Sequence, residues 1–398
     1  MLSLQRRGDC HLVSVVPVSS TDAGPCVVGP GTRFLSGITY YTYGLTNALA
    51  SHGHVSVILL RRLLPQRLYP GRCRVGADLA GVRLPEGAAA FDGLDWFWVP
   101  SLLRAIVFLR RRRPRTLVLQ WWTGTVLHSY LALALAARLM RIPLVIEFHE
   151  ALDTGEDRIP LAGRYVNALA PRLFRGASAY IVHTEHDRDL VCGRFGLDPA
   201  RVSVVPHAIY THSIGAAPAP LRPAPADVCN LLFFGVIRPF KGLDDLLAAF
   251  DAMGDDEVGR YWLTIVGESW EGVDAASMVE RSRHRDRITL VNRYVTEAEA
   301  DGYFQGADAV VLPYHRSSQS GPLHMAFGYG LPTVVTSVGG LVEAVEPYAG
   351  AVVVAPHDPE SLLDGIRRVA PMRDSRFSHP QSWASVGALY ADVLEGVR

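Results

Sequence analysis

Short runs of β-branched and apolar residues alternate along the first half of the chain with longer segments of helical periodicity. Runs of this length and composition predict buried strands, and apolar residues three and four apart predict helices between them. Such alternation is typical of βαβ units, which build a mostly parallel sheet with helices on both faces. The predicted strands of this half are residues 11–18, 54–60, 116–122, 143–149 and 179–184.

The same alternation begins again after a proline-rich segment at residues 215–226, which we interpret as a linker. We therefore predict an α/β chain with two doubly wound, Rossmann-like domains, residues 1–214 and 227–381, that face a central cleft. Ligands of open α/β sheets bind beyond the carboxyl ends of the strands, so this cleft is the expected site. The predicted strands of the second domain are residues 230–236, 262–268, 288–294, 309–314, 332–338 and 351–356.

The C-terminal segment, residues 382–398, has apolar residues at helical spacing and predicts an amphipathic helix. The pattern leaves two positions open for this helix, which can close the second domain or cross back and pack on the first. The chain length of 398 residues exceeds what one ordinary core holds, which agrees with two domains.

The bulk composition excludes several classes of protein. Lys plus Arg and Asp plus Glu number 39 each, so no overall positive field points to nucleic acid. The five cysteines are scattered without a CxxC pair, which indicates neither a zinc site nor disulfides and favours a reducing compartment. Because no apolar run reaches about 18 residues and the N-terminus lacks a signal-peptide core, we expect a soluble, cytoplasmic protein.

One helical segment, residues 101–115, joins an apolar stretch to a run of arginines. An amphipathic helix with a basic end can dock on anionic lipid headgroups, here at the inner face of the membrane. The alternative is a core helix whose basic end is solvated. The sequence leaves both interpretations open.

Residues 235–242, GVIRPFKG, place two cations where a buried strand ends and a helical pattern begins. A helix N-terminus presents unpaired N–H groups and a positive dipole end, which favour an anion. Arg238 offers a planar fork and Lys241 a point charge, a pair suited to a diphosphate. The alternative is a solvated loop with two ordinary surface cations.

A second candidate anion site follows the predicted strand at 309–314. Residues 317–325, SSQSGPLHM, bring small polar side chains and Gly321 to the start of a helix, where Pro322 suits the first turn. The alternative is a serine-rich turn that only caps a helix. Two such loops in one domain favour the anion-binding interpretation of both.

Four segments of the second domain resemble the retaining GT-B glycosyltransferases, in particular the family 4-like group that includes sucrose synthases and phosphatidylinositol mannosyltransferases. In order, these segments are GVIRPFKGLDDLL, TIVGE, NRYVTEAEADGYFQGADAVVLPY and AFGYGLPTVVTSVGGLVE. The N-terminal half agrees more loosely, through GPGTRFLSGITYYTYGLTNALASHGHVSVI, VIEFHE and VSVVPHAIY. The resemblance implies a GT-B fold and transfer of a hexosyl group from a nucleotide sugar with retention of configuration.

The resemblance also implies roles for individual residues. Arg238 and Lys241 match the pair that holds the donor diphosphate and stabilises the leaving group, and His149 matches a histidine near the sugar. Gly37, in the loop after the first strand, matches a glycine that lets the backbone approach the donor phosphate. The other implied donor contacts are Asn292, Arg293, Tyr294 and Val295 beside the nucleobase, and Ser320, Gly321, Pro322 and Leu323 around the sugar and diphosphate.

One departure from the family pattern concerns two glutamates that contact the sugar hydroxyls and the ribose. Ser317 and Met325 occupy these positions here. A methionine thioether is a weak acceptor for a ribose hydroxyl, whereas Ser317, Ser318 or Gln319 can still meet sugar hydroxyls. We interpret the change as altered donor contacts rather than loss of activity.

Two strand ends in the first domain carry histidines whose roles the residues alone leave open. On position alone, His149 is more often a structural residue, and only the resemblance favours a functional one. At residues 183–187, HTEHD, either Glu185 and His186 line the cleft or Thr184 caps a helix. The sequence shows no cluster at metal-ligand spacing, no GxxxxGK[ST] loop and no GxGxxG, so we predict neither a metal nor a cofactor.

We therefore predict a metal-independent glycosyltransferase that uses a UDP- or GDP-sugar. The sequence does not identify the acceptor, and a lipid-linked acceptor is one option. Two alternatives remain, a sugar-nucleotide epimerase on the same fold and a catalytically silent sugar-nucleotide binding protein. An epimerase would convert the donor without an acceptor, and a silent protein would never release nucleoside diphosphate.

Overall fold

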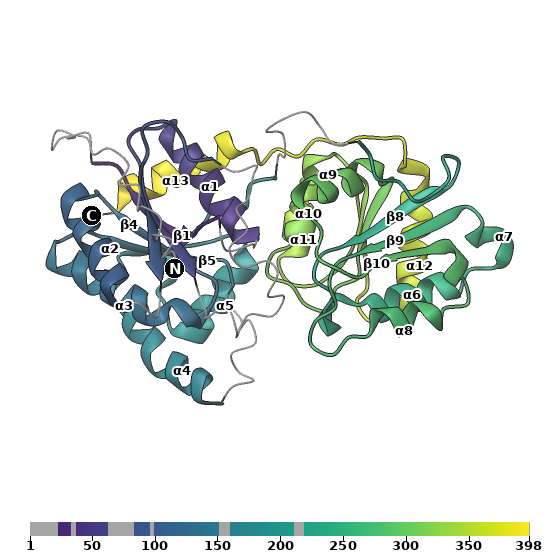
Figure 1. Ribbon diagram of the computed structural model, residues 1–398, viewed down its shortest axis with the longest axis horizontal. Coiled ribbons are helices and arrows are strands. Elements are labelled where there is room, and N and C mark those ends of the chain that lie inside the picture. The colour runs from purple at the N-terminus through teal and green to yellow at the C-terminus, as the bar shows by residue number, and fades with distance from the viewer. Residues whose placement is uncertain are drawn as a thin grey trace, which may run out of the picture.

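The computed structural model describes residues 23–32, 37–62, 83–95, 99–150, 160–210 and 219–397. These residues form two parallel sheets side by side, each with helices on both faces (Figure 1). The predicted α/β class with two doubly wound, Rossmann-like halves is confirmed. The predicted strand at 11–18 and residues 211–218, which include the start of the predicted linker, lie outside the described residues.

The first sheet has the order β3-β2-β1-β4-β5-β6-β7, and its neighbouring strands are parallel. The strands are β1 (Cys26–Pro30), β2 (Ser56–Arg62), β3 (Ala89–Asp95), β4 (Leu117–Trp121), β5 (Leu144–Phe148), β6 (Ala179–Val182) and β7 (Val202–Val204). Helices α2 (Val99–Arg112), α3 (Leu127–Leu139), α4 (Pro160–Arg175) and α5 (Glu185–Phe195) pack on one face. Helices α1 (Gly37–Ala50) and α13 (Trp383–Gly396) pack on the other.

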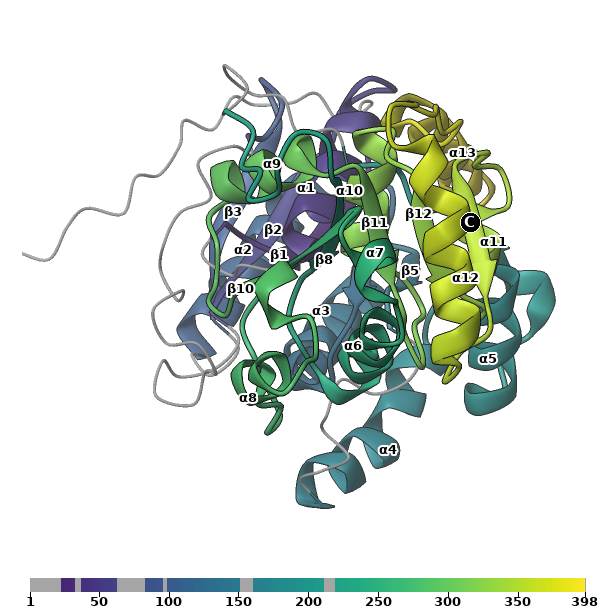
Figure 2. The same ribbon diagram turned by 90° about the vertical axis from the view of Figure 1, so that its right-hand side faces the viewer.

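The second sheet has the order β10-β9-β8-β11-β12-β13 and is also parallel. Its strands are β8 (Cys229–Phe234), β9 (Tyr261–Val266), β10 (Ile288–Val291), β11 (Ala309–Leu312), β12 (Thr333–Thr336) and β13 (Ala351–Val354). Helices α6 (Leu243–Asp251), α7 (Asp255–Val258), α8 (Ala275–Glu280) and α12 (Pro359–Val369) contribute to the core on one face. Helices α9 (Glu297–Gly306), α10 (Gly321–Gly328) and α11 (Leu341–Val345) cover the other. Figure 2 shows α6 and α12 side by side.

The strand order reverses once in each sheet. In the first sheet the reversal lies between β1 and β4, and in the second it lies between β8 and β11. Loops at the carboxyl ends of such strands diverge to opposite faces and leave room for a ligand. The two anion-binding segments predicted from the sequence follow these strands: residues 235–242 form the loop after β8, and residues 317–325 lie after β11 and include the first turn of α10.

Three strands of the first sheet were not predicted. Strand β1 contains glycine and proline, and β3 alternates half-buried and exposed residues around Asp92 and Gly93, so neither has the apolar run that marks the central strands. Strand β7 has only three residues. These three segments form strands because they pair with β2, β4 and β6 in the folded sheet. Their own sequences do not favour a strand strongly enough to predict one.

The C-terminal helix α13 crosses back to the first half of the chain and packs against α1 (Figure 1). Glycines permit this contact, since a Cβ atom on Gly44 would lie 2.2 Å from the Trp383 ring and one on Gly387 would lie 2.8 Å from Ala48. The side chain of Tyr390 is fully buried in the core beneath α1. The helix therefore takes the second of the two positions that its pattern allowed.

Helix α2, which overlaps the predicted amphipathic segment 101–115, combines a buried and an exposed stripe. Ser101, Ala105 and Leu109 are buried against the first half's core. Val99 and Leu103 remain more than half exposed, at 66% and 57%. The helix therefore covers the sheet and also presents an apolar stripe to the outside. Within the described residues, no helix has the length and apolar character needed to cross a membrane.

Candidate active site

The loop after β8 brings Arg238 and Lys241 to the point where the second sheet reverses its strand order. A short 3-10 turn, Pro239–Lys241, precedes Gly242, which has φ 65° and is the residue immediately before α6. A Cβ atom at Gly242 would lie 1.9 Å from the carbonyl oxygen of Pro313, the first residue after β11. Only glycine fits this left-handed, crowded position, so the loop after β8 packs directly on the segment after β11.

The ammonium group of Lys241 lies over the ring of Tyr314, with its nitrogen 3.5 Å from the ring centroid. Burial, and then the positive charge of Arg238, lower the pKa of Lys241 to about 7, against the opposing effect of Glu150. Among the described residues, no carboxylate forms an ion pair with this lysine. A partly buried lysine whose pKa is lowered and which has no carboxylate in an ion pair among the described residues is well suited to bind an anion.

Arg238 is held on the same side of the loop by the segment after β9. Its guanidinium lies 5.1 Å from the Trp270 ring centroid, and its Nε atom is 3.8 Å from Oε1 of Glu271. Its charge is still close enough to Lys241 to lower the pKa of the lysine. The structure therefore brings the two predicted cations together, with Arg238 anchored by an aromatic ring and a carboxylate.

The second predicted loop, before α10, adjoins the first. Ser320 caps α10 by accepting a hydrogen bond from the backbone N–H of Leu323 at 3.3 Å. At the end of β8, Gly235 has φ 113°, and a Cβ atom there would lie 3.3 Å from the ring of Pro322. The N-terminus of α10, at Gly321, thus lies beside the end of β8. The structure therefore shows the helix cap that was the alternative interpretation of residues 317–325. It also shows that this loop lies beside the loop after β8.

The positions of the two missing family glutamates differ in their surroundings. The Ser317 hydroxyl donates to the backbone oxygen of Gln319 at 2.9 Å. Gln319 pairs with His324 at 3.1 Å through its side-chain oxygen, while its amide nitrogen is buried without a hydrogen-bond partner. Met325 packs in the core against α9 and α11 and is only 9% exposed. Of these positions, Gln319 retains an unused polar group.

Contacts between the two halves surround this region. The hydroxyl of Ser318 donates to Oε1 of Glu150, the residue after His149, at 3.2 Å. Tyr210, near the end of the first half, donates its backbone N–H to the carbonyl oxygen of His324 in α10 at 3.2 Å and its hydroxyl to the backbone oxygen of Gly37 at 3.0 Å. Gly37 is the first residue of α1 and not part of a loop, which corrects the predicted position, and residues 33–36 before it lie outside the described part of the chain.

A clasp between α11 and α5 adds two further hydrogen bonds between the halves. The Glu343 carboxylate accepts from the backbone N–H of Glu185 at 2.7 Å and from that of His186 at 2.8 Å. Thr184 caps α5 by accepting from the Asp187 N–H at 3.0 Å. The capping role considered for Thr184 is therefore observed, and Glu185 and His186 contribute their backbone N–H groups to the clasp.

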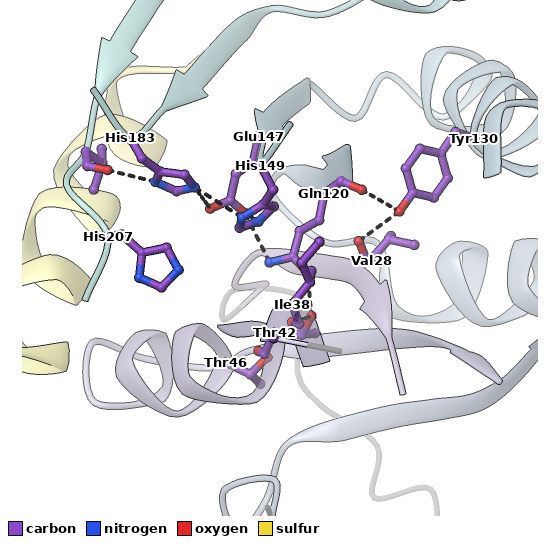
Figure 3. A network of polar contacts seen from close by, with 12 residues as sticks. Val28, Ile38, Thr42, Thr46, Gln120, Tyr130, Glu147, His149, His183 and His207 are labelled. Carbon is purple, nitrogen blue, oxygen red and sulfur yellow. Dashed lines mark hydrogen bonds and ion pairs between the residues drawn. The ribbon is translucent and has the colours of Figure 1, made fainter. Parts of the chain in front are cut away.

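His149 directly follows β5 and belongs to a buried polar network (Figure 3). Its Nδ1 lies 3.2 Å from Nε2 of His183, and its Nε2 lies 3.4 Å from Oε2 of Glu147. The amide of Gln120 donates to the same Glu147 oxygen at 3.1 Å. Burial raises the pKa of Glu147, but His149 and His183 more than offset this effect and leave the pKa at about 2. Glu147 is therefore ionised inside the protein.

The four residues predicted to lie beside a nucleobase, 292–295, have different surroundings. Asn292 accepts a hydrogen bond from the Ser269 N–H at 2.9 Å and so ties the ends of β9 and β10 together. Arg293 is exposed and forms an ion pair with Glu299 in the first turn of α9. Tyr294 is partly buried, and Val295 is part of the core. Asn292 is therefore the member of this segment whose side chain is held directly at the strand ends.

Two groups of three side chains, among the described residues, have potential metal-ligand atoms within 4.8 Å of one another. In the first, Glu147, His149 and His183, hydrogen bonds and ion-pair contacts already join these atoms. The second consists of Asp245, His315 and His357, in which Nε2 of His315 is 2.8 Å from Asp245 and the two imidazole centroids are 3.8 Å apart. Spacing along the sequence gave no sign of either group.

Sequence reasoning missed His183, Tyr314 and Glu343. A signal for Glu147 was present, because a charged residue inside the apolar run of a central strand must find partners in the interior. His183 is the first residue of the HTEHD segment, in which the sequence indicated roles only for Thr184, Glu185 and His186. Tyr314 and Glu343 carried no signal, since their partners lie far away in sequence.

Comparison with known proteins covers both halves. Residues 36–208 match the family described as Glycosyl transferase 4-like domain, and residues 229–371 match the family described as Glycosyl transferases group 1. The chain is 28% identical to the D-inositol 3-phosphate glycosyltransferase 2 of Catenulispora acidiphila, over 92% of this chain and 91% of that protein.

Solved structures show the same architecture. The catalytic domain of starch synthase IV from Arabidopsis thaliana, bound to ADP and acarbose, matches with a TM-score of 0.68 and 13% identity over 94% of this chain and 99% of that chain. The Anabaena protein HepE in complex with UDP-glucose matches with a TM-score of 0.57 and 13% identity over the same shares. The chain therefore belongs to the GT-B glycosyltransferases that join a glycosyl transferase 4-like domain to a group 1 domain, and it transfers sugar from a nucleotide sugar.

Proposed function

We propose that this glycosyltransferase transfers a hexosyl group from a UDP-sugar with retention of configuration and without a metal ion. The observation that carries the proposal is the placement of Lys241 beside Arg238 at the strand reversal of the second sheet. The N-terminus of α10 lies across from them, next to Gly235. Two cations and a helix N-terminus together suit the charged oxygens of a nucleoside diphosphate.

The proposed chemistry follows from where charge develops. As the bond between the sugar carbon and the diphosphate oxygen breaks, negative charge builds on the departing phosphate, and preorganised cations stabilise it. The acceptor hydroxyl attacks the same face of the sugar and gives its proton to the departing phosphate. Lys241 and Arg238 then supply the charge that a divalent metal supplies in other transferases. His149 lies near the sugar, and the residues around Ser320 hold the donor.

The individual donor contacts follow the same proposal. Gly37 at the start of α1 faces the diphosphate, and Asn292 with Tyr294 flanks the base. Ser317 and Gln319 replace a glutamate as partners of the sugar hydroxyls, which the buried, unpartnered amide nitrogen of Gln319 supports. The epimerase and silent-binder alternatives are not favoured, because the matched families and relatives are transferases.

A donor screen tests the proposal. Purified protein is titrated calorimetrically with UDP-, GDP- and ADP-hexoses, and release of nucleoside diphosphate is then measured with candidate acceptors. We expect a UDP-hexose to bind tightest. Arg238→Ala and Lys241→Met should each weaken UDP binding about 10- to 100-fold, because hydrogen bonds between charged groups contribute about 1.5–3 kcal/mol.

Arg367→Ala is the matched control for these variants, since Arg367 is an arginine on the outer helix α12 that pairs with Glu257. UDP affinity should not change in this variant. Unchanged UDP affinity in both Arg238→Ala and Lys241→Met would remove the proposed diphosphate site. Donor binding without nucleoside diphosphate release for any acceptor would contradict transfer.

We also propose that the first half contacts an anionic membrane surface through the outer faces of α2, α3 and α4. These helices carry exposed apolar side chains together with basic last turns. The exposed apolar residues are Val99, Leu103, Val107, Leu135, Leu139 and Tyr165, and the arginines are Arg110, Arg111, Arg112, Arg138, Arg172 and Arg175. Apolar insertion combined with basic charge favours anionic lipid over neutral lipid.

Vesicle flotation tests this membrane contact. The protein should float with phosphatidylglycerol vesicles and not with phosphatidylcholine vesicles, and salt should weaken the binding. Leu103→Gln should reduce binding about fivefold or more, because burying a leucine is worth about 1.5–3 kcal/mol. Leu389→Gln, which changes an exposed leucine on α13, is the control. Equal binding to both lipids, or an equal loss in both variants, would contradict the proposal.

A further inference from the structure

Three segments at the carboxyl end of the second sheet bring Asp245, His315 and His357 together. Asp245 lies in the first turn of α6, His315 comes three residues after β11, and His357 comes three residues after β13. A potential ligand atom of each residue lies within 4.8 Å of those of the other two. None of these residues is a proposed donor contact, so the transfer reaction leaves the group without a role.

The packing of Gly242 fixes the positions of the first two residues. A Cβ atom at Gly242 would lie 1.9 Å from the Pro313 oxygen and 3.2 Å from Nε2 of His315. This close approach brings Nε2 of His315 to 2.8 Å from Oδ2 of Asp245, on the helix that follows the glycine. The backbone N–H of His315 also donates to the carbonyl oxygen of Phe240 at 2.8 Å. Backbone contacts therefore hold both sides of the His315–Asp245 pair.

His357 is placed by the start of α12, which packs beside α6 (Figure 2). Asp358 caps α12 by accepting from the Ser361 N–H at 3.0 Å, and Pro359 occupies the first turn. The backbone of His357 has φ 56°, a left-handed conformation that histidine adopts more readily than most other residues with a side chain. Its ring centroid lies 3.8 Å from that of His315. The turn after β13 therefore brings the His357 ring against His315.

The group is open to solvent on the side of His357. The side chains of His315 and Asp245 are 17% and 18% exposed, and His357 is exposed. Within the described part of the chain, the His357 ring makes no hydrogen bond or ion pair. A histidine–aspartate hydrogen bond alone would explain the first two residues and leave the position of His357 without a reason. An ion can reach all three residues from solvent.

We propose that Asp245, His315 and His357 bind a divalent transition-metal ion of the Zn²⁺ class. Two imidazole nitrogens and one carboxylate oxygen suit Zn²⁺, whereas Mg²⁺ and Ca²⁺ prefer sites made of oxygen alone. The ion replaces the hydrogen that lies between His315 and Asp245, and this hydrogen leaves to solvent. A water molecule completes the fourth position on the exposed side.

The separations require a small movement of one ligand. Bonds of about 2.0–2.2 Å in a tetrahedral arrangement place ligand atoms roughly 3.3–3.6 Å apart. The separations in this group reach at most 4.8 Å, so the widest of them must shorten. His357 is the exposed member, and its side chain can turn inward while the backbone contacts of the other two residues stay in place.

The ion joins the two loops that carry the Lys241–Tyr314 contact. Tyr314 directly precedes His315, and Lys241 ends the turn that leads into α6. An ion bound to His315 and Asp245 therefore holds both loops at the sheet edge, and His357 adds the start of α12. This role is structural and separate from the transfer step, for which no metal is proposed. An ion that binds only the folded form stabilises that form.

Metal titration tests the site directly. Protein treated with EDTA and then freed of the chelator is titrated calorimetrically with Zn²⁺, and Mg²⁺ serves as the comparison ion. We expect Zn²⁺ to bind and His357→Asn to weaken its affinity by about 10- to 100-fold or more, since even the loss of an outer partner has such an effect. Asparagine tolerates the left-handed backbone. His52→Asn, at an exposed histidine of the first half, is the matched control and should not change the affinity.

Two results of this titration would overturn the proposal. One is the absence of Zn²⁺ binding by the wild type. The other is equal affinity in His357→Asn and His52→Asn, which would place the ion elsewhere, for example at the group of Glu147, His149 and His183. If His357→Asn does not fold, Asp245→Asn provides the same test, because it keeps an acceptor for His315 and removes the carboxylate.

Hydrogen exchange tests where the ion acts. The His315 amide donates to Phe240, so at Zn²⁺ ten times above its Kd the exchange of this amide should slow by about tenfold. The same Zn²⁺ concentration should not slow it in His357→Asn, nor should it slow the Glu185 amide of the first half in the wild type. Unchanged exchange of the His315 amide in the wild type would contradict the bracing of the two loops.

A further measurement separates this inference from the proposed function. Protein treated with EDTA should still bind UDP, because the proposed donor site needs no metal. Loss of UDP binding would contradict metal-independent transfer, while the Zn²⁺ titration would still decide the site. UDP binding in a protein that takes up no Zn²⁺ would contradict the metal site alone.

Discussion

The ammonium nitrogen of Lys241 lies 3.5 Å from the ring centroid of Tyr314, and the two residues come from the loops after β8 and β11. The ring shields one side of the ammonium from water, and its face attracts the positive charge. Burial and Arg238 nevertheless lower the pKa of Lys241 to about 7. The lysine is therefore partly neutral in the free enzyme at neutral pH.

We predict that UDP binding draws a proton onto Lys241. A bound diphosphate raises the pKa of the lysine, so at about pH 8 the free enzyme is mostly neutral at this site and the complex is protonated. Affinity should fall as the pH rises above about 7, and it should not change between about pH 5.5 and 6.5 on account of this group. Calorimetry in buffers of different ionisation enthalpy should show uptake of about one proton at pH 8.

Lys241→Arg is the control for this prediction, because arginine stays protonated at every pH used. It should bind UDP without proton uptake from this site. Equal uptake in the wild type and in Lys241→Arg would show that another group titrates.

We predict that Glu343 holds the two halves together through the N-terminus of α5. Its carboxylate accepts from the N–H groups of Glu185 and His186, and such a contact at a helix start contributes about 0.5–2 kcal/mol. Glu343→Ala should therefore speed hydrogen exchange of these two amides about 2- to 30-fold. Glu346→Ala, an exposed neighbour beyond α11, should leave them unchanged. Equal exchange in both variants would show that the clasp is not formed in solution.

We predict that Gly242 is required for the shape of the diphosphate loop. Its φ is 65°, and a Cβ atom would lie 1.9 Å from the Pro313 oxygen, so Gly242→Ala should destabilise the second half by about 2 kcal/mol or more. Urea unfolding measures this loss. Gly193→Ala in α5, where nothing lies within 4 Å of the added atom, should be neutral or stabilising by up to about 1 kcal/mol. Similar unfolding midpoints for the two variants would contradict the packing.

The sequence predicted those parts of the site that depend on short segments. Arg238 and Lys241 are three residues apart in one loop, and strand-to-helix order alone places that loop at the sheet edge. Ser320 and Pro322 carry the signature of a helix start, which the structure contains. The resemblance further linked the two loops, and the structure shows them adjacent.

The network around His149 could not be predicted in the same way. Glu147, Gln120 and His183 lie on β5, on β4 and directly after β6, and they meet only because those strands are neighbours in one register. Tyr390 reaches the same region because α13 crosses back from the end of the chain. Short sequence patterns do not indicate which distant residues will meet in the fold. For this reason the contact of Glu343 with the start of α5 was not predicted either.

We predict, finally, that Glu150 sets the pH at which Lys241 changes charge. Glu150 raises the pKa of the lysine, against burial and Arg238, while it accepts a hydrogen bond from Ser318 of the other half. Glu150→Gln removes that negative charge and keeps an acceptor for Ser318. The pKa of Lys241 in the free enzyme should therefore fall, so more of the lysine is neutral at about pH 7.

Two opposing effects of Glu150→Gln on UDP can be separated by pH. At about pH 5.5 the lysine is protonated in both proteins, and loss of a carboxylate near the diphosphate should strengthen UDP binding. At about pH 7 more binding energy goes into protonating Lys241, so proton uptake should exceed that of the wild type. Ser318→Ala, which removes the hydrogen bond and leaves the charge, should not shift the uptake curve. If Glu150→Gln and the wild type take up protons over the same pH range, Glu150 does not act on Lys241, and the two halves do not share one electrostatic site.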